Sequence, residues 1–250
     1  MKVSVAIITK DAAGQLDRCL ASLAFADEVV VLDQGSTDDT AAVCARRGAA
    51  LHQGPWEGFG RTKQRAVALC RNRWVLNVDS DEEVSPELAA AITALPDAPP
   101  VAAYAVNRLS RFLGTWIRHC GWHPDRVVRL FDRERAGFDD RPVHESVRHP
   151  GAAGRLPGLV LHHTYGTMEQ YIARLDRYTT LAAGDLHARG RRSGPVVAVW
   201  RAEAAFWRMW LLQGGWRDGG AGLVLCRASS FYVLAKYVKL WRLGQAAERT

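Results

Sequence analysis

Short apolar runs, rich in β-branched residues, alternate with helical segments through the first 95 residues, and this alternation restricts the possible fold more than any other feature. The runs at 3–8, 28–32, 49–52 and 73–78 are typical of buried strands. Helical spacing follows at 12–24, 41–47, 62–70 and 86–94. Strands and helices that alternate at this spacing predict an α/β domain with a parallel sheet and right-handed crossovers.

The ends of two of these helices carry specific boundary signals. Ser85 before Pro86 predicts an N-cap followed by proline at the first helical position. Gly48 predicts the end of the helix at 41–47. Ser36 or Thr37 is the expected cap at the start of that helix.

Polar residues follow three of the predicted strands directly. Thr9 ends the first strand, Asp33 the second, and Asp79-Ser80-Asp81 follows the run at 74–78. Ligands on open parallel sheets bind at the carboxyl ends of the strands. We therefore expect these side chains to lie around one binding site.

Asp79 and Asp81 are two carboxylates separated by one residue at a strand end. Neighbouring carboxylates repel each other, and burial raises the cost of ionising them. A hard divalent cation removes that cost, binds oxygen ligands and keeps positions for substrate phosphates. The pair predicts a site for a metal and a diphosphate; the alternative is that both residues cap the next turn.

The pattern changes after a proline-rich break at 96–100. Strands are expected at 104–106, 127–131 and 159–162, and a helix at 168–183. Two long amphipathic helices follow at 195–212 and 223–243. We predict an α/β domain over 1–185, in two parts (1–95 and 101–185), with a helical appendage over 186–250.

The appendage is basic and rich in tryptophan. Residues 186–250 contain 11 Lys and Arg against 3 Asp and Glu, whereas the whole chain has a formal net charge of +7. This composition suggests an anionic membrane surface as partner, with nucleic acid as the competing possibility. Since no uninterrupted apolar run approaches the roughly 20 residues of a membrane span, we expect peripheral contact. The apolar stripe of the first helix includes Trp200 and Trp207, for which packing on the body or a dimer contact is the alternative.

The five cysteines are scattered, and no two are spaced as Cys-x-x-Cys. This pattern favours reduced thiols in a cytoplasmic protein over a disulfide framework or a zinc site. The apolar stretch at 3–8 is too short for a signal peptide.

With these elements in order, the chain resembles the family 2 glycosyltransferases. The resemblance rests on residues 5–11, 27–40, 56–64 and 77–82. Further stretches at 129–131, 143–145, 161–165, 215–219 and 236–240 are similar to the subgroup of bacterial lipopolysaccharide-core β-glucosyltransferases. The resemblance implies a GT-A fold (a Rossmann-like, mostly parallel sheet with flanking helices), a UDP-sugar donor and inversion at the anomeric carbon. It also implies a single displacement, in which a base takes the acceptor proton and Mg²⁺ or Mn²⁺ stabilises the leaving diphosphate.

The resemblance also implies roles for residues around the donor. Asp81 is the expected metal ligand, and Asp79 is expected to touch the ribose, or the metal through water. Asp33 would contact the nucleotide base or the ribose, and Thr9 would lie near the nucleotide base. By the same resemblance, 1–95 is the nucleotide-binding half and 101–185 is the acceptor and catalytic half. Arg61 and Lys63, in a glycine-rich loop, would close on the diphosphate. Glu82 and Glu83 are expected to be solvated.

The acceptor half supplies the remaining candidates. Glu145 lies where the family has its catalytic base, with His144 orienting it or contacting the diphosphate, and Asp139 and Asp140 are the alternatives for the base. His162 and His163 alternate faces if they lie in a strand, so only one of them, His162, is a candidate contact to metal or phosphate. Arg126, Arg129 and Arg133 form a basic run that is expected to meet an acidic acceptor, with ordinary surface charge as the alternative.

Together these features predict a metal-dependent, inverting, cytoplasmic enzyme attached peripherally to the inner membrane. The expected reaction transfers a hexose, with glucose favoured, to a lipopolysaccharide core or related envelope glycan. Polyprenyl phosphate or another envelope glycan is the alternative acceptor. A non-enzymatic basic protein that binds membranes or nucleic acid is the alternative of another class; no nucleic acid is expected for the enzyme.

Overall fold

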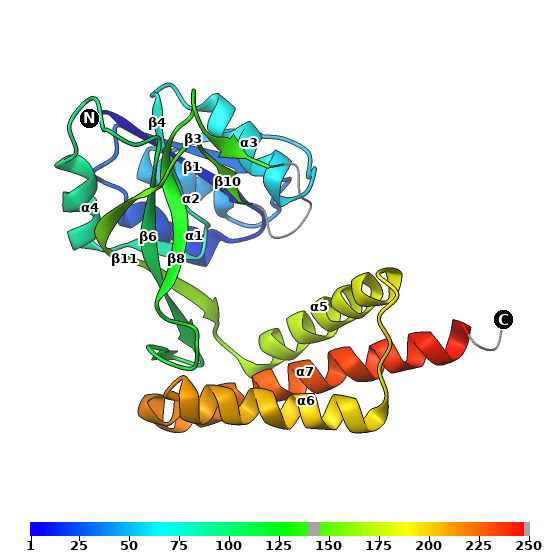
Figure 1. Cartoon of the computed structure of the whole chain (residues 1–250). Helices are drawn as coiled ribbons and strands as arrows, with labels where there is room; N and C mark the ends of the chain where they lie inside the picture. Colours follow the sequence, from blue (N-terminus) through cyan, green and yellow to red (C-terminus); the bar gives the residue numbers. More distant parts are fainter. Residues whose placement is uncertain (140–145, 248–250) are drawn as a thin grey trace. The chain divides into compact units, whose positions relative to one another are not determined.

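The structure is a computed structural model that describes residues 1–139 and 146–247 of the chain. It divides into two compact units (Figure 1). The first comprises Met1–Leu109 with Asp125–His162, and the second comprises Ser110–Pro124 with His163–Thr250. We call them the sheet unit and the helical unit.

A mixed sheet forms the framework of the sheet unit. Its first four strands, in spatial order, are β3 (Ala50–Gln53), β2 (Glu28–Asp33), β1 (Val3–Thr9) and β4 (Trp74–Asn77). The sheet continues with β8 (Asp125–Asp132), β6 (Ala103–Phe112), β11 (Gly154–Tyr165) and β5 (Glu82–Val84). A separate pair consists of β9 (Gly137–Phe138) and β10 (Val147–Arg148).

The prediction of a parallel sheet is confirmed for β3, β2, β1 and β4, all of which pair in parallel. Beyond β4 the pairing is antiparallel between β4 and β8, between β8 and β6, and between β11 and β5. The short strand β5 is not predicted from the sequence. In the antiparallel half, β11 pairs with β5, the strand that directly follows the turn at Asp79–Asp81.

Helices cover both faces of this sheet. Helices α1 (Ala13–Ala21), α2 (Thr40–Arg47) and α4 (Pro86–Thr93) contribute Leu16, Val43 and Leu88 to one apolar cluster, with Val5 and Ile7 of β1. Helix α3 (Phe59–Leu69) packs in a second cluster with Ala6 and Ile8 of the same strand. Successive residues of β1 therefore enter opposite layers, as the period of two in a strand requires. Each fully buried Leu or Ile stabilises the fold by about 1.5–3 kcal/mol.

The helix boundary signals are confirmed at two sites and wrong at one. The Ser85 hydroxyl accepts a hydrogen bond from the Leu88 amide at 3.2 Å, with Pro86 as the first residue of α4. Gly48 ends α2 in the left-handed conformation, at φ 70°. Helix α2 begins at Thr40 and not at 36 or 37, because the Ser36 hydroxyl is bonded to Asp33 instead.

The helical unit contains α5 (Met168–Ala188), α6 (Pro195–Trp207), α7 (Gly219–Ala247) and the short strand β7 (Thr115–Trp116). The helix expected over 195–212 ends at Trp207, where a π-helical turn (Arg208–Leu212) and a 3₁₀ turn (Gly215–Asp218) follow. Apolar side chains from the inserted segment and the helices share one core; it includes Phe112, Ile117, Tyr171, Leu175, Phe206, Met209 and Leu225.

This division differs from the predicted domains, which place the boundary between 185 and 186. Helix α5 belongs to the helical unit because Tyr171 and Leu175 are buried in its core, together with Phe206 and Leu225. The segment Ser110–Pro124 joins the same unit. A linear boundary does not describe a unit that is assembled from two separate stretches of chain.

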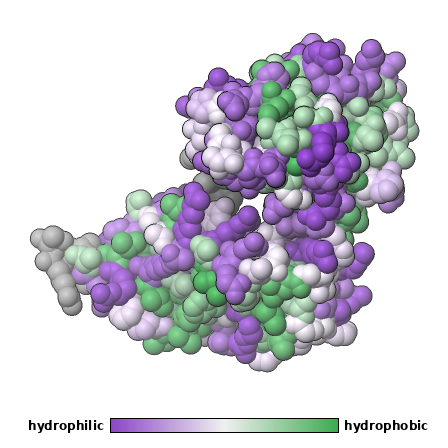
Figure 2. Space-filling view, turned by 180° about the vertical axis from the view of Figure 1, so that it is seen from behind, coloured by the Kyte–Doolittle hydropathy of each residue, from purple (hydrophilic) through white to green (hydrophobic). Residues whose placement is uncertain are grey.

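Helix α6 has two apolar faces, and the predicted one is exposed. Ala198, Ala202 and Phe206 are buried, and α6 packs on α7. In contrast, Trp200 is 70% exposed and Trp207 is 51% exposed. The helical unit therefore carries apolar patches on its surface (Figure 2, lower part). The alternative that these tryptophans pack on the body stays a prediction.

Helix α7 bears on the expectation of peripheral contact. With the turn before it, the stretch Gly215–Ala246 has the length to cross a membrane. Its most apolar 18-residue window has a mean hydropathy of 1.2, and 28% of that window is buried. Arg227, Lys236 and Lys239 interrupt the run of apolar residues, and all three lie in the single continuous helix α7. One helix thus has the length and composition that could cross a membrane, although no uninterrupted apolar run reaches that length. Peripheral contact stays a prediction.

Candidate active site

The turn after β4 is anchored by a buried group of charged side chains. Arg129, on β8, is 6% exposed, and its Nη2 atom donates to Asp79 Oδ2 at 2.8 Å and to Glu82 Oε1 at 2.5 Å. Its Nη1 atom donates to the Asn77 amide oxygen at 3.0 Å. Glu82 in turn accepts from the Asp79 backbone N–H at 3.0 Å. These bonds fix the path of the turn at 79–82.

Lys63 is the second cation at this turn. It lies in α3 and not in a loop, is 4% exposed, and its Nζ is 2.8 Å from Asp79 Oδ1. The Nζ also lies 5.8 Å from the centre of the Phe138 ring. Arg61 is on the same helix. The prediction that both cations lie in a loop before the helix is wrong, because α3 begins at Phe59, immediately after Gly58.

The charges shift the pKa values of the two buried carboxyls in opposite directions. Burial raises the pKa of Asp79, but the charges of Arg129 and Lys63 outweigh it and hold this pKa well below the usual 3.8. For Glu82, burial and the charge of Asp79 raise the pKa although Arg129 lowers it. Asp79 is therefore held as a carboxylate, with each oxygen bonded to a cation.

Asp81 points to a different partner. Its Oδ2 atom lies 3.3 Å from His162 Nε2, and the two side chains are 18% and 16% exposed. His162 is on β11, next to β5, and pairs with Glu82 in the register of the sheet. The alternation of the two histidines is confirmed, because His163 packs against the Trp116 ring, with centres 5.1 Å apart.

Asp81 and His162 fit the divalent metal that the sequence analysis predicts. A carboxylate and an imidazole lie side by side and partly open to solvent, in the manner of a site that shares an ion with a substrate phosphate. Among the described residues no group of three or more His, Cys, Asp or Glu side chains is arranged to hold a metal. The ion would therefore need donor oxygens from the substrate and water. Asp79 fits less well as a ligand, since Lys63 and Arg129 occupy both of its oxygens.

Thr9 and Asp33 end the two neighbouring strands, paired with each other in register. The Thr9 hydroxyl is buried and finds no hydrogen-bond partner in the described part of the chain. The Asp33 carboxylate accepts from the Ser36 amide, at 3.0 and 3.2 Å, and from the Ser36 hydroxyl at 2.5 Å. Asp33 thus stabilises the turn before α2. The hydroxyl of Thr9, on the neighbouring strand, makes no hydrogen bond within the described residues.

The predicted base lies outside the described residues. Glu145, His144 and Asp140 all fall in the segment 140–145, so their roles stay predictions. Asp139 is described: its two carboxylate oxygens accept from the Ser146 amide and hydroxyl at 3.2 and 3.1 Å, and Arg148 lies 3.2 Å away.

The basic run does not form one surface. Arg126 is exposed on β8, Arg129 is buried among its carboxylate partners, and Arg133 bonds to the carbonyls of Val67 and Cys70. The expected contact of Arg129 with an acidic acceptor is therefore wrong, because its charge is enclosed at the Asp79 turn. Arg126 stays a candidate.

Sequence reasoning missed the buried role of Glu82, which is 1% exposed and not solvated. It also missed Arg108, whose guanidinium lies 3.8 Å from Glu82 and 2.7 Å from Asp125. Part of this could be predicted from the sequence. Arg108 and Arg129 interrupt apolar strands, and a cation at such a position needs a buried partner of opposite charge.

Comparisons with known proteins identify the family of the chain. The sequence model of Glycosyl transferase family 2 matches residues 4–160. The lipopolysaccharide core biosynthesis glycosyltransferase LpsC of Rhizobium meliloti (strain 1021) is 27% identical over 261 residues, which cover 97% of this chain and 93% of LpsC. The glycosyltransferase RT0209 of Rickettsia typhi is 29% identical over 257 residues, covering 96% and 87% of the two chains.

A solved structure, glucosyl-3-phosphoglycerate synthase from Mycobacterium tuberculosis in complex with Mn²⁺, UDP and glucosyl-3-phosphoglycerate, aligns with a TM-score of 0.41 at 22% identity. The alignment covers 53% of this chain and 57% of that one, so the likeness has no bearing on substrate. The family match, together with the observed sheet and flanking helices, confirms the predicted GT-A fold and an enzyme, against the non-enzymatic alternative. The chain is a glycosyltransferase and belongs to glycosyl transferase family 2.

Proposed function

We propose that this glycosyltransferase transfers a hexose, with glucose favoured, from a UDP-sugar to a lipopolysaccharide core or related envelope glycan. The family supports sugar transfer. The relative LpsC, matched over nearly the full length of both chains, supports an acceptor in the lipopolysaccharide core. The choice of UDP and of an inverting displacement follows the family resemblance of the donor-site motifs.

One observation carries the metal-dependent part of the proposal. Asp81 and His162 lie 3.3 Å apart at the strand ends, while the neighbouring Asp79 is already neutralised by Lys63 and Arg129. Asp81 and His162 would hold a divalent ion, and an imidazole beside a carboxylate favours Mn²⁺ over Mg²⁺. When bound, the ion supplies positive charge to the leaving diphosphate.

The protein's own residues prepare the donor side of the reaction. Arg129 and Lys63 hold Asp79 in one ionised state, and Glu82 fixes its backbone amide, so the turn presents Asp81 in a single direction. The Thr9 hydroxyl at the end of β1, buried and without a partner among the described residues, would bond the nucleotide. A base takes the proton of the acceptor hydroxyl, and Glu145 is the residue proposed for this step.

The helical unit is proposed to attach the enzyme peripherally to the cytoplasmic face of an anionic membrane. Apart from Trp56 and Leu69, every exposed large apolar side chain among the described residues belongs to this unit. Leu212 is 84% exposed, and Arg208 and Arg217 lie near it in the chain. Exposed apolar and basic side chains together favour an interfacial position over full solvation.

A thermal-shift panel of nucleoside diphosphates with and without Mn²⁺ tests the donor site. A ligand at 100 times its dissociation constant adds about 2.7 kcal/mol to the stability of the folded state. We expect a shift with UDP and Mn²⁺ together, lost in Asp81→Asn and retained in Asp97→Asn, whose side chain is 95% exposed. A shift that persists in Asp81→Asn would contradict the proposed metal site.

Transfer assays then identify the acceptor. UDP-glucose and other UDP-hexoses are offered with lipopolysaccharide core oligosaccharide or with polyprenyl phosphate, and the anomeric configuration of the product is read by NMR. A β-linked hexose on the core oligosaccharide is expected. Transfer to polyprenyl phosphate alone would move the enzyme to the alternative acceptor, and retention of configuration would contradict the single displacement.

A further inference from the structure

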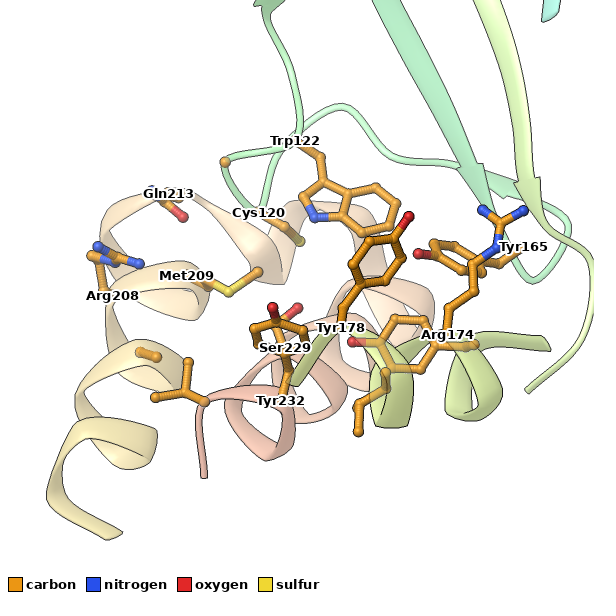
Figure 3. Close-up of a pocket in the computed structure, with 15 residues that line it drawn as sticks. Cys120, Trp122, Tyr165, Arg174, Tyr178, Arg208, Met209, Gln213, Ser229 and Tyr232 are labelled. Carbon is orange, nitrogen blue, oxygen red and sulfur yellow. The ribbon is translucent and has the colours of Figure 1, made fainter. Parts of the chain in front are cut away.

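The helical unit contains a pocket of about 400 Å³ that no step of the proposed transfer uses (Figure 3). The walls come from the loop at 120–122, Tyr165 and helix α5. The end of α6, the π-helical turn after it and α7 complete them. Ligand sites for small molecules commonly fall between about 300 and 1,000 Å³. The pocket therefore has room for a small ligand and lies wholly within one compact unit.

Aromatic rings form much of the wall. Figure 3 shows Trp122, Tyr165, Tyr178 and Tyr232 around the cavity, and Tyr171 also lines it. Flat rings bury apolar C–H surface well and lose little freedom when they do so. The polar tips of tyrosines also make hydrogen bonds, so such a wall suits a ligand with apolar faces and hydroxyl edges.

The tyrosine hydroxyls at this pocket are neutral donors and acceptors. Burial raises the pKa of Tyr171 to about 12 and also raises that of Tyr232. A neutral hydroxyl both donates and accepts a hydrogen bond, which matches the hydroxyl groups of a sugar. Ser229 and Gln213 add further polar groups to the lining.

The charge of the lining is entirely positive. Arg174 and Arg208 line the pocket, and no Asp or Glu does. Neither guanidinium has a carboxylate partner within the described ranges 1–139 and 146–247, although Arg174 lies over the Tyr165 ring at 5.2 Å. A guanidinium stacked on an aromatic ring keeps its N–H edge available for a carboxylate or phosphate.

From these contacts we propose that the pocket binds a sugar carrying an anionic group, either phosphate or carboxylate. The rings of Trp122 and Tyr178 pack on the sugar, and Arg174, beside Tyr165, binds the anion, whereas Arg208 lies across the cavity (Figure 3). A role in holding part of an acidic glycan acceptor rests on the proposed function, whereas the binding itself does not. A purely apolar occupant, such as an acyl chain, would leave both guanidinium groups unpaired against it.

Isothermal titration calorimetry on the full chain, without nucleotide or metal, tests the binding. The probes are glucose 6-phosphate, glucuronate, glucose, inorganic phosphate and octyl phosphate. We expect glucose 6-phosphate or glucuronate to bind at least tenfold more tightly than glucose or inorganic phosphate, and the preferred one identifies the anion. Octyl phosphate binding more tightly than both acidic sugars would overturn the proposal in favour of a lipid.

Variants locate the binding. Arg174→Gln should weaken binding of the preferred acidic sugar by about tenfold, the usual effect of losing one charge-assisted hydrogen bond. Arg208→Gln, across the cavity, should weaken it less. Arg177→Gln is the matched control, since Arg177 is exposed on the same helix but does not line the pocket. Equal binding by all three variants and the wild type would overturn the assignment.

The UDP and Mn²⁺ thermal shift of the same samples separates this inference from the proposed function. Binding of an acidic sugar with no UDP response would retain the pocket and refute the donor site. A UDP response with no discrimination between glucose and its acidic derivatives would retain the donor site and refute the pocket. If one Arg variant fails to fold, the other variant and the ligand comparison in the wild type decide the outcome.

Discussion

Arg129 and Asp79 form a buried ion pair at the end of β4, with Nη2 2.8 Å from Oδ2. The two residues are brought together by the antiparallel pairing of β8 with β4. Because the same guanidinium also binds Glu82, one cation fixes both carboxylates that border the turn carrying Asp81. The metal-binding geometry proposed for Asp81 therefore depends on Arg129, which lies 48 positions later in the chain.

Replacing Arg129 should destabilise the protein strongly. Arg129→Met leaves the carboxylates of Asp79 and Glu82 buried without their shared cation, and such a loss typically costs about 3–5 kcal/mol. Urea denaturation measures the change in the free energy of unfolding. Arg126→Met, at an exposed position of the same strand, is the control and should change this free energy by about 0.5 kcal/mol or less. Similar losses in both variants would contradict the structural role of Arg129.

The stability contributed by Asp79 should depend on pH with a defined sign. Its folded pKa lies well below the usual 3.8, so the stabilisation is fully present above that value and is lost as pH falls through the folded pKa. The difference in unfolding free energy between wild type and Asp79→Asn should be constant from pH 7 to about pH 5 and shrink below about pH 4. Because the charge of Asp79 also raises the pKa of Glu82, both proteins in this comparison should carry Glu82→Gln, so that the difference reports Asp79. A difference that grows on acidification would refute the assignment.

Gly158 should tolerate no side chain. Its φ is +86°, and a Cβ there would lie 2.3 Å from the Leu88 backbone nitrogen at the start of α4. Gly151 also has a positive φ, +66°, but has open space around it. Gly151→Ala should therefore cost only the backbone strain, about 1–2 kcal/mol, and Gly158→Ala clearly more. Chemical denaturation of both variants makes the comparison, and equal losses would show that the contact with α4 relaxes.

Membrane attachment should depend on the exposed side chains of the helical unit. Trp200→Ala should weaken binding to anionic vesicles by about tenfold, since burying a large apolar side chain is worth about 1.5–3 kcal/mol. Trp56→Ala is the matched control, because Trp56 is 52% exposed in the sheet unit. Cosedimentation at increasing salt measures both effects.

Alkaline washing of bacterial membranes distinguishes peripheral attachment from a spanning α7. The enzyme should be released, because attachment through α6 and basic side chains is reversible. Full retention after the wash would favour α7 as a membrane span and contradict peripheral binding.

The sheet was predictable where side chains alternate with a clear period. The β-branched run of β1 and the Ser85-Pro86 cap depend on neighbouring residues only, and both are confirmed. Strand direction beyond β4 was not predictable, because an apolar strand reads the same in parallel and antiparallel pairing. The two apolar faces of α6 are a similar case, since periodicity finds both stripes but not the one that packs on α7.

The candidate site was predictable in its positions and less so in its connections. Thr9, Asp33, Asp79 and Asp81 follow strands that end at one edge of the sheet, as their spacing indicates. The burial of Glu82 was not evident, because consecutive acidic residues usually face solvent and its partner Arg129 is distant in sequence. Arg129 also contacts one oxygen of Asp79, and Lys63 contacts the other, so Asp79 fits less well than Asp81 as a metal ligand.

Binding of Mn²⁺ in the presence of UDP, followed by electron paramagnetic resonance, tests the central claim that Asp81 and His162 hold the metal. Wild-type protein should bind one ion, and Asp81→Asn and His162→Gln should each weaken that binding by tenfold or more. His163→Gln, at the neighbouring strand position that faces Trp116, should bind as wild type. Unchanged Mn²⁺ affinity in both Asp81→Asn and His162→Gln would contradict the account.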